Sequence, residues 1–188
     1  MPDRPDALVE RLEQLAGSVD LVLTSGGASA GAADVVGRLT ETRHRVESLA
    51  VRMRPGKPLV VGRVSAGPGG REVPLIGLPG NPVAAMVAFE VFAGPAIARL
   101  RGLRHDGVRV VQARSLDELR ATPGRVCFAR VRVERDDDGR LVARSTGGGC
   151  GHGVRSLVGA NGLAVLPADG SDVRPGDLVP VRMTGWSA

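Results

Sequence analysis

Apolar and polar residues follow two distinct patterns along the first half of the chain, one typical of helices and one typical of buried strands. Between residues 3 and 16 the apolar positions recur at helical spacing, which predicts a helix with one buried face. Residues 19–24 are largely apolar on both faces, as expected of a central strand covered on both sides. A short helix is predicted at 32–39, and further strands at 59–61 and 73–76. This pattern predicts an α/β domain of three layers with a parallel-rich sheet.

After one long apolar helix, the predicted elements change from alternating helices and strands to short strands. That helix is predicted over residues 82–100, with a kink at Gly94-Pro95 because proline has no backbone N–H to donate. Beyond it, Gly, Asp and Pro turns separate short strand-like runs at 108–113, 126–133, 141–143, 163–166 and 178–181. We therefore predict an α/β domain at residues 1–102 and an all-β domain, a small barrel or sandwich, at residues 103–188.

The charge of the chain favours an anionic partner. The formal net charge is +5 and the pI is near 10.7. Nearly all the basic residues are arginines, because Lys57 is the only lysine. Aromatic residues make up 2% of the chain and tyrosine is missing, so the stacking platforms of single-strand binders are scarce. We expect no nucleic-acid partner.

The sequence also bears on location and redox state. No apolar run approaches the roughly 20 residues that a membrane span requires. Residues 1–6 lack the basic start and apolar stretch of a signal peptide, so we expect a cytoplasmic protein without a membrane partner. Cys127 and Cys150 lie far apart without Cys-x-x-Cys spacing. Two reduced thiols are therefore expected rather than a disulfide or a zinc site.

A glycine-rich turn follows the strand predicted at 19–24. Ser25, Gly26 and Gly27 stand where this strand ends and a helix begins, so backbone N–H groups can approach an anion there. Such turns are common, and a plain strand-to-helix turn is the alternative. Asp34 stands at the start of the next helix. It is either a first-turn carboxylate favoured by the helix dipole or a group that holds Mg²⁺ or handles a proton.

A basic segment precedes the strand predicted at 59–61. Arg52 and Arg54 alternate on an extended backbone and so point the same way, and Lys57 follows a turn. Three cations in so short a segment suit an oxyanion clamp. A solvated basic loop is the alternative, with equal weight.

The most specific segment is Leu78-Pro79-Gly80-Asn81-Pro82. Its two prolines fix the backbone around Gly80 and Asn81 directly after a predicted strand. The loop should leave the same sheet edge as the glycine-rich turn, which predicts that an anion binds between the two. A plain rigid turn is the alternative.

In this order and spacing, the three segments resemble the molybdopterin-binding domain of the MoeA and gephyrin E-domain family. The residues that carry the resemblance are Leu23-Thr24-Ser25-Gly26-Gly27 with Gly31 and Asp34, Arg54-Pro55-Gly56-Lys57-Pro58, and Gly77-Leu78-Pro79-Gly80-Asn81-Pro82. The second domain is similar to the family's C-terminal β domain through Thr122-Pro123-Gly124-Arg125, Phe128-Ala129-Arg130, Ser156-Leu157 and Ala160-Asn161-Gly162-Leu163. The resemblance covers nearly the whole chain.

The resemblance implies an enzyme of molybdenum cofactor biosynthesis. Such an enzyme transfers molybdenum from molybdate to adenylylated molybdopterin with release of AMP, as a homodimer helped by Mg²⁺. By position it implies catalytic roles for Asp34, Arg54 and Lys57, and Mg²⁺ coordination by Asp34 and Asp3. It implies cofactor binding by Ser25, Gly26, Gly27, Pro79, Gly80, Asn81, Pro82 and Arg130. Cations would then hold molybdate and phosphate, while the dithiolene supplies the metal ligands.

Three departures from the family pattern leave other functions open. The chain begins at what resembles the middle of the α/β domain, Ala50 stands where a basic residue is frequent, and Gly151 where serine is common. Arg52, on the same strand face as Ala50, could replace the basic residue. A non-catalytic pterin-binding or scaffold module and a molybdopterin adenylyltransferase are the alternatives, and the attached β domain argues against the latter. We expect this chain alone to bind molybdopterin but to insert molybdenum poorly.

Overall fold

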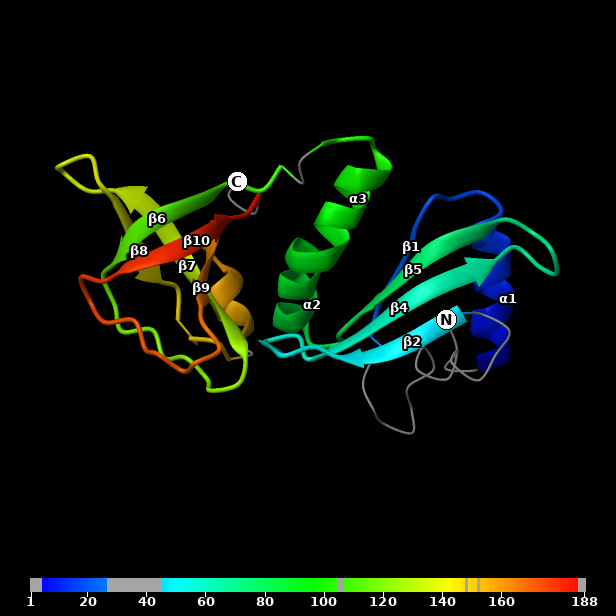
Figure 1. Ribbon diagram of the computed structural model, residues 1–188, viewed down its shortest axis with the longest axis horizontal. Coiled ribbons are helices and arrows are strands. Elements are labelled where there is room, and N and C mark those ends of the chain that lie inside the picture. Colours follow the sequence, from blue (N-terminus) through cyan, green and yellow to red (C-terminus); the bar gives the residue numbers. More distant parts are fainter. Residues whose placement is uncertain (1–4, 27–44, 105–106, 148, 152, 186–188) are drawn as a thin grey trace. The chain divides into compact units, whose positions relative to one another are not determined.

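The computed structural model describes residues 5–26, 45–104, 107–147, 149–151 and 153–185 (Figure 1). Two compact units divide the chain: Met1–Val51 with Gly56–Arg104, and Arg52–Pro55 with His105–Ala188. The segment Arg52–Pro55 thus joins the second unit, although it lies far from it in sequence. A linear division of the chain at residue 102 does not include this exchange.

A mixed sheet forms the centre of the first unit. Its strands lie in the order β1 (Val22–Ser25), β5 (Glu72–Leu78), β4 (Pro58–Ser65) and β2 (Arg45–Ala50). Strand β5 is parallel to β1 but antiparallel to β4, and β4 is antiparallel to β2. The short connections from β2 to β4 and from β4 to β5 impose this, because parallel neighbours need a crossover of about a dozen residues or more. The predicted α/β class is confirmed, whereas the described strands are not parallel-rich.

Helices cover both faces of this sheet (Figure 1). Helix α1 (Pro5–Ala16) packs through Leu8 and Leu12 on one face, against Val60, Val64, Val73 and Leu75. The other face, with Leu59, Ile76 and Leu78, packs against the helix that follows β5. Neighbouring side chains of a strand point to opposite faces, so β4 and β5 are apolar on both sides. The three predicted layers are confirmed.

The helix after β5 continues through three segments, α2 (Pro82–Ala88), a π-helical turn η2 (Phe89–Ala93) and α3 (Gly94–Leu100). The Gly94 N–H donates to the Phe89 carbonyl, five residues back, which defines the wide turn. The irregularity lies directly before the Gly94-Pro95 pair at which a kink was predicted. Because Pro95 cannot donate, a break in the regular hydrogen-bond ladder is expected there.

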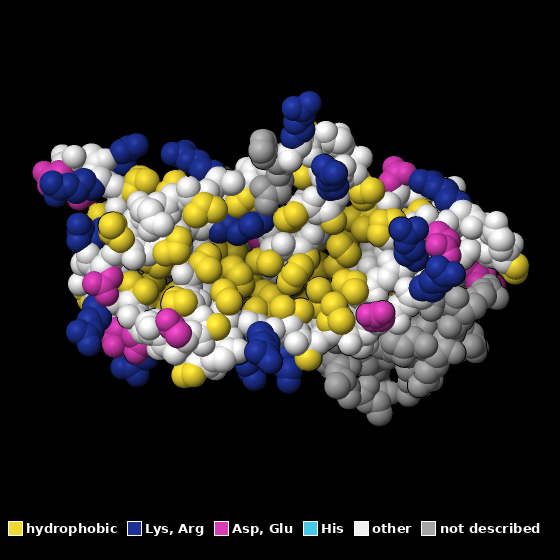
Figure 2. All heavy atoms as spheres, viewed as in Figure 1, with side chains coloured by type: hydrophobic (Ala, Val, Ile, Leu, Met, Phe, Trp, Pro, Cys, Tyr) yellow, Lys and Arg dark blue, Asp and Glu magenta, His cyan; other side chains and the backbone are white. Residues whose placement is uncertain are grey.

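By length and composition alone, the helix Pro82–Leu100 could cross a membrane. The sequence analysis expected no such run, so this is a correction. One side of the helix packs on the sheet through Ala88 and Ala93, and 33% of the apolar stretch is buried. Met86 and Leu100 are its exposed large apolar side chains, and Figure 2 shows apolar side chains at the surface along part of this helix.

A closed barrel forms the second unit. Its strands are β7 (Val126–Arg135), β8 (Leu141–Ser145), β6 (Val110–Ser115), β10 (Leu178–Met183) and β9 (Gly162–Leu166), in this spatial order. Strand β9 also pairs with β7, which closes the ring. The core inside it includes Cys127, Ala129, Val131, Leu166 and Val181. All five predicted runs overlap these strands, and of the two predicted architectures the barrel is the one formed.

The barrel gains one short strand from the first part of the chain. Strand β3 (Met53–Arg54) pairs in parallel with β7, with Met53 opposite Val126 and Arg54 opposite Cys127. Met53 is buried while Arg52 and Arg54 are exposed, which confirms the predicted alternation of the basic segment. The barrel therefore holds Arg54 in place through backbone pairing.

Candidate functional site

The two glycine-containing loops of the first unit leave the same edge of the sheet. Strands β1 and β5 are parallel neighbours with Ser25 opposite Leu78, so their carboxyl ends coincide. The Gly26 N–H donates to the Leu78 carbonyl at 3.1 Å. A Cβ placed on Gly80 would lie 3.4 Å from the Gly26 Cα. For the described residues, the prediction that the loops face one another is confirmed; Gly27 lies outside that part of the chain.

Asn81 ends the second loop by capping α2. Its side-chain Oδ1 accepts hydrogen bonds from the N–H groups of Val83 and Ala84, at 3.1 and 3.2 Å. These two N–H groups of the first turn of the helix are therefore satisfied within the protein. Among the described residues, the N–H groups of Gly80 and Asn81 have no protein acceptor, and both residues are exposed. These two groups and the Asn81 Nδ2 are the donors that the loop offers to an anion.

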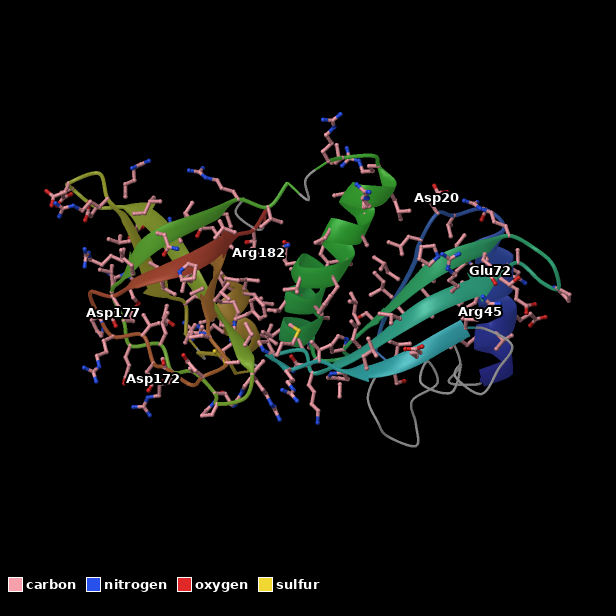
Figure 3. The ribbon with its side chains drawn as sticks, viewed as in Figure 1. Asp20, Arg45, Glu72, Asp172, Asp177 and Arg182 are labelled. Atoms are coloured by element: carbon pink, nitrogen blue, oxygen red, sulfur yellow. The ribbon has the colours of Figure 1, made fainter. Side chains whose placement is uncertain are left out.

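Other predicted residues of this edge have different surroundings. Ser25 and Pro82 are exposed beside the loop. Pro79 is buried, so it restricts the loop backbone but presents no side-chain surface to a ligand. At the opposite end of β1 and β5, ion pairs join Arg71 to Asp20 and Arg63 of β4 to Glu72. Asp20 and Glu72 are labelled in Figure 3. These ion pairs are therefore not part of the candidate edge.

The predicted basic clamp is divided between the units. Arg54 belongs to the barrel unit, where its Nη1 donates to the Thr122 Oγ1 at 3.2 Å. Lys57 belongs to the α/β unit and is exposed, with its carbonyl accepting from the Val51 N–H at 2.8 Å. Sequence reasoning did not identify Thr122 as the partner of Arg54, because the two residues are 68 positions apart.

Arg130 does not have the ligand-facing position that was predicted. Its side chain is 0% exposed. The guanidinium donates to the Ser156 Oγ at 2.9 Å, the Phe128 carbonyl at 3.1 Å and the Gly151 carbonyl at 2.9 Å. Burial lowers the pKa of Arg130, and the nearby Cys150 partly opposes that shift. Arg130 therefore fastens the segment around Gly151 and Ser156 to the barrel, and its buried side chain has no exposed surface.

The two cysteines meet in the barrel core. Both are free and buried, as the expectation of reduced thiols requires. Both side chains belong to the same core cluster, and the Cys150 Sγ donates to the Arg120 carbonyl at 3.6 Å. Burial, reinforced by Cys127, raises the pKa of Cys150 to about 12 although Arg130 and Arg54 act in the opposite direction. A thiol so hard to ionise is a packing residue at neutral pH.

The predicted metal ligands, Asp3 and Asp34, lie outside the described residues. Within the described ranges, no group of three or more His, Cys, Asp or Glu side chains could hold a metal ion. Magnesium remains a prediction that rests on Asp3 and Asp34.

Comparison with known families assigns both units. Residues 1–99 match the family described as "Probable molybdopterin binding domain", and residues 112–183 match "MoeA C-terminal region (domain IV)". The chain belongs to the MoeA family. The two family matches follow one another along the chain in the same order as the α/β unit and the barrel.

Relatives of this MoeA-family chain are longer than the chain itself. It is 34% identical to molybdopterin molybdenumtransferase 1 of Mycobacterium tuberculosis over 94% of this chain and 42% of that protein. It is 36% identical to a molybdopterin molybdenumtransferase of Nostoc sp. over 88% of this chain and 38% of the other. Gephyrin of Dictyostelium discoideum is 29% identical over 98% of this chain and 28% of its own length. The chain thus spans about two fifths or less of these curated relatives.

Solved structures share the fold. A molybdopterin biosynthesis MoeA protein from Pyrococcus horikosii superposes with a TM-score of 0.73 at 25% identity, over 99% of this chain and 42% of that one. A molybdenum cofactor biosynthesis protein from Pyrococcus furiosus gives a TM-score of 0.71 at 27% identity, over 97% and 56% respectively.

Proposed function

We propose that this chain acts in the cytoplasm in molybdenum cofactor biosynthesis, as the substrate-binding C-terminal portion of a molybdopterin molybdenumtransferase. The reaction transfers molybdenum from molybdate to adenylylated molybdopterin and releases AMP. The observation that supports it best is the pairing of the Ser25-Gly26 and Gly80-Asn81 loops at one sheet edge, in a chain of the MoeA family. The curated relatives named above as molybdenumtransferases support the reaction type.

The loops would bind the phosphates of the adenylylated pterin. Gly26 and Gly80 lack side chains, so a phosphate can approach the backbone closely. The N–H groups of Gly80 and Asn81, with the Asn81 carboxamide, would donate to its oxygens. Pro79 and Pro82 keep this loop rigid, which lowers the entropy lost on binding.

Cations and carboxylates would then serve the metal transfer. Arg54 and Lys57 are exposed cations and suit the dianion molybdate. Asp34, with Asp3, would hold Mg²⁺ and neutralise the phosphate charge that develops as AMP leaves. The dithiolene sulfurs of the pterin become the molybdenum ligands, so the protein need only hold the two substrates together.

A homodimer through the α/β unit is part of this proposal. The helix from Pro82 to Leu100 keeps Met86 37% and Leu100 51% exposed, with Phe92 and Ile97 only partly buried. Apolar surface of this kind favours association. Sedimentation at tens of micromolar should show a dimer that Met86→Asp weakens and the matched barrel substitution Leu178→Asp does not. A monomer at that concentration would contradict it.

The function is tested by measuring binding and turnover separately. Adenylylated molybdopterin, molybdate and Mg²⁺ are supplied, AMP release is followed, and pterin affinity is measured alongside. Arg54→Ala should weaken anion binding by about 1.5–3 kcal/mol, whereas Arg71→Ala removes an equal charge at the far end of β5 and should not. Asp34→Asn should abolish residual insertion but leave pterin affinity nearly intact.

The outcomes separate the candidate functions. Binding with little turnover fits the proposed portion of an enzyme, and complementation by the remaining family domains should then restore AMP release. Binding without turnover even after complementation would favour the non-catalytic pterin-binding module. No detectable pterin binding would refute the site.

A further inference from the structure

We propose that Thr122 is a positioning residue, which orients the Arg54 guanidinium so that its free edge can bind the oxyanion substrate. The inference rests on the proposed function and adds a residue to it. Thr122 would touch no substrate itself and would act only through Arg54.

The starting observation is the contact between the two side chains. The Arg54 Nη1 donates to the Thr122 Oγ1 at 3.2 Å. The backbone of Arg54 is fixed at the same time, because β3 pairs with β7 and the Val126 N–H donates to the Arg52 carbonyl at 2.9 Å. Both ends of the Arg54 side chain are therefore tied to the barrel unit.

A tight turn presents the Thr122 hydroxyl. Pro123 and Gly124 occupy its central positions, Gly124 has a φ of 77°, and the Arg125 N–H donates to the Thr122 carbonyl at 3.2 Å. Proline at the first and a positive-φ glycine at the second central position are the marks of a type II turn. Thr122 is the first residue of this turn, so the turn itself restricts the backbone conformation of Thr122, independently of the contact with Arg54.

Hydrogen bonds also anchor the Thr122–Arg125 turn to residues 168–172, which follow β9. The Gly124 N–H donates to the Ala168 carbonyl and the Ala121 N–H to the Asp172 carboxylate, each at 2.7 Å; Asp172 is labelled in Figure 3. Pro123 packs on Gly170 so closely that a Cβ there would lie 2.8 Å from the Pro123 Cγ. These contacts hold in place the turn that carries the Thr122 hydroxyl, which accepts the hydrogen bond from Arg54.

The contact with Thr122 can orient the Arg54 guanidinium because this group is planar and rigid. A guanidinium is planar, so a hydrogen bond on one edge fixes the direction of the donors on the others, and these match an oxyanion in pairs. Arg54 forms no ion pair with any described carboxylate, so its charge is not cancelled from within. A lysine ammonium would rotate freely and gain nothing comparable from a fixed acceptor. The Thr122 contact thus suits the arginine of this chain.

The test measures the affinity of the whole chain for inorganic molybdate by calorimetry. Thr122→Val keeps the shape but removes the acceptor, and should weaken binding about threefold to tenfold, with Thr122→Ser restoring it. Arg54→Ala should weaken binding about tenfold to a hundredfold. In the Arg54→Ala background, Thr122→Val should have no further effect. Thr184→Val is the matched control, because the Thr184 hydroxyl has no hydrogen-bond partner among the described residues.

The outcomes test the role of Thr122 separately from the role of Arg54 and from the proposed function. If Arg54→Ala weakens binding but Thr122→Val does not, or if the two losses simply add, Thr122 is not a positioning residue and the proposed function stands. If neither substitution changes the affinity, or the wild-type chain does not bind molybdate, Arg54 is not the oxyanion ligand and the inference falls with it. Binding of adenylylated molybdopterin, measured in the same samples, then shows whether the pterin site survives. Thermal unfolding of Thr122→Val and Thr122→Ser separates a loss of fold from a loss of orientation.

Discussion

Gly26 and Gly80 lie against each other where the two loops of the α/β unit leave the sheet. A Cβ on Gly80 would stand 3.4 Å from the Gly26 Cα, and one on Gly26 would stand 3.9 Å from the Gly80 Cα. The backbone conformations differ, because Gly26 has a φ of 88° while that of Gly80 is not positive. The two glycines are therefore required for different reasons, one for conformation and one for an open approach to the loop.

Alanine substitution should distinguish the two glycines. Gly26→Ala places a side chain at a φ that L residues rarely adopt and should lower the free energy of unfolding by about 1–2 kcal/mol. Gly80→Ala meets only an ordinary van der Waals contact and should change it by less than about 0.5 kcal/mol. Urea unfolding of both variants measures the difference. Equal losses would show that close approach, and not conformation, governs both positions.

Arg130 should be a determinant of barrel stability. Arg130→Met keeps the length of the side chain but removes the donor from the buried Phe128 carbonyl, the buried Ser156 hydroxyl and the partly buried Gly151 carbonyl. A loss of about 2–4 kcal/mol in the free energy of unfolding is expected, since unsatisfied buried groups cost about 1–3 kcal/mol each and partial relaxation is usual. Arg132→Met is the matched control on the same strand, because Arg132 is exposed and forms only a surface ion pair with Glu134. Equal stability of the two variants would contradict the assigned role.

The edge of the sheet was predictable from local sequence, because its determinants are local. Residues 73–78 are apolar on both faces and end at two prolines, which marks both a central strand and a rigid loop. Strand β2 was not predicted, since only Val46 of its six residues is buried and no alternation is visible. Strand β3 has two residues, too few for any period.

Contacts between distant residues account for the remaining differences. Arg130 lies between Ala129 and Val131 on β7, and nothing in that alternation reveals that Gly151 and Ser156 cover it. The meeting of Cys127 with Cys150 and of Arg54 with Thr122 depends in the same way on strand pairing. Such pairings are fixed by the fold and leave no spacing in the sequence. The predicted cofactor role of Arg130 came from the resemblance alone.

The free energy of unfolding should fall at alkaline pH because of Cys150. Burial raises the pKa of Cys150 in the folded state to about 12, above its ordinary value of 9.0. The folded thiol therefore keeps its proton where the unfolded one loses it, so its contribution is complete below pH 9 and decreases as the pH rises toward 12. Urea unfolding between pH 8 and about 11 measures the slope, and Cys150→Ala should reduce it. A slope unchanged by the substitution would mean that other groups cause the alkaline loss.

Asn81 allows helix capping and ligand binding to be separated. Asn81→Asp keeps an oxygen for the N–H groups of Val83 and Ala84 and places a negative charge at a helix N-terminus, so the free energy of unfolding should stay within about 0.5 kcal/mol.

The same substitution removes the Nδ2 donor and sets a carboxylate beside the proposed phosphate site. Two like charges about 4 Å apart near a protein surface repel by about 1–4 kcal/mol, so adenylylated molybdopterin should bind about tenfold more weakly or worse. Asn81→Ala should show the reverse pattern, with about 1 kcal/mol lost from stability and a smaller loss of affinity. Gln112→Glu on β6 of the barrel makes the same amide-to-acid change and controls for net charge. If Asn81→Asp binds the ligand as well as wild type, the anion does not lie at this loop, and the site must be sought elsewhere on the chain.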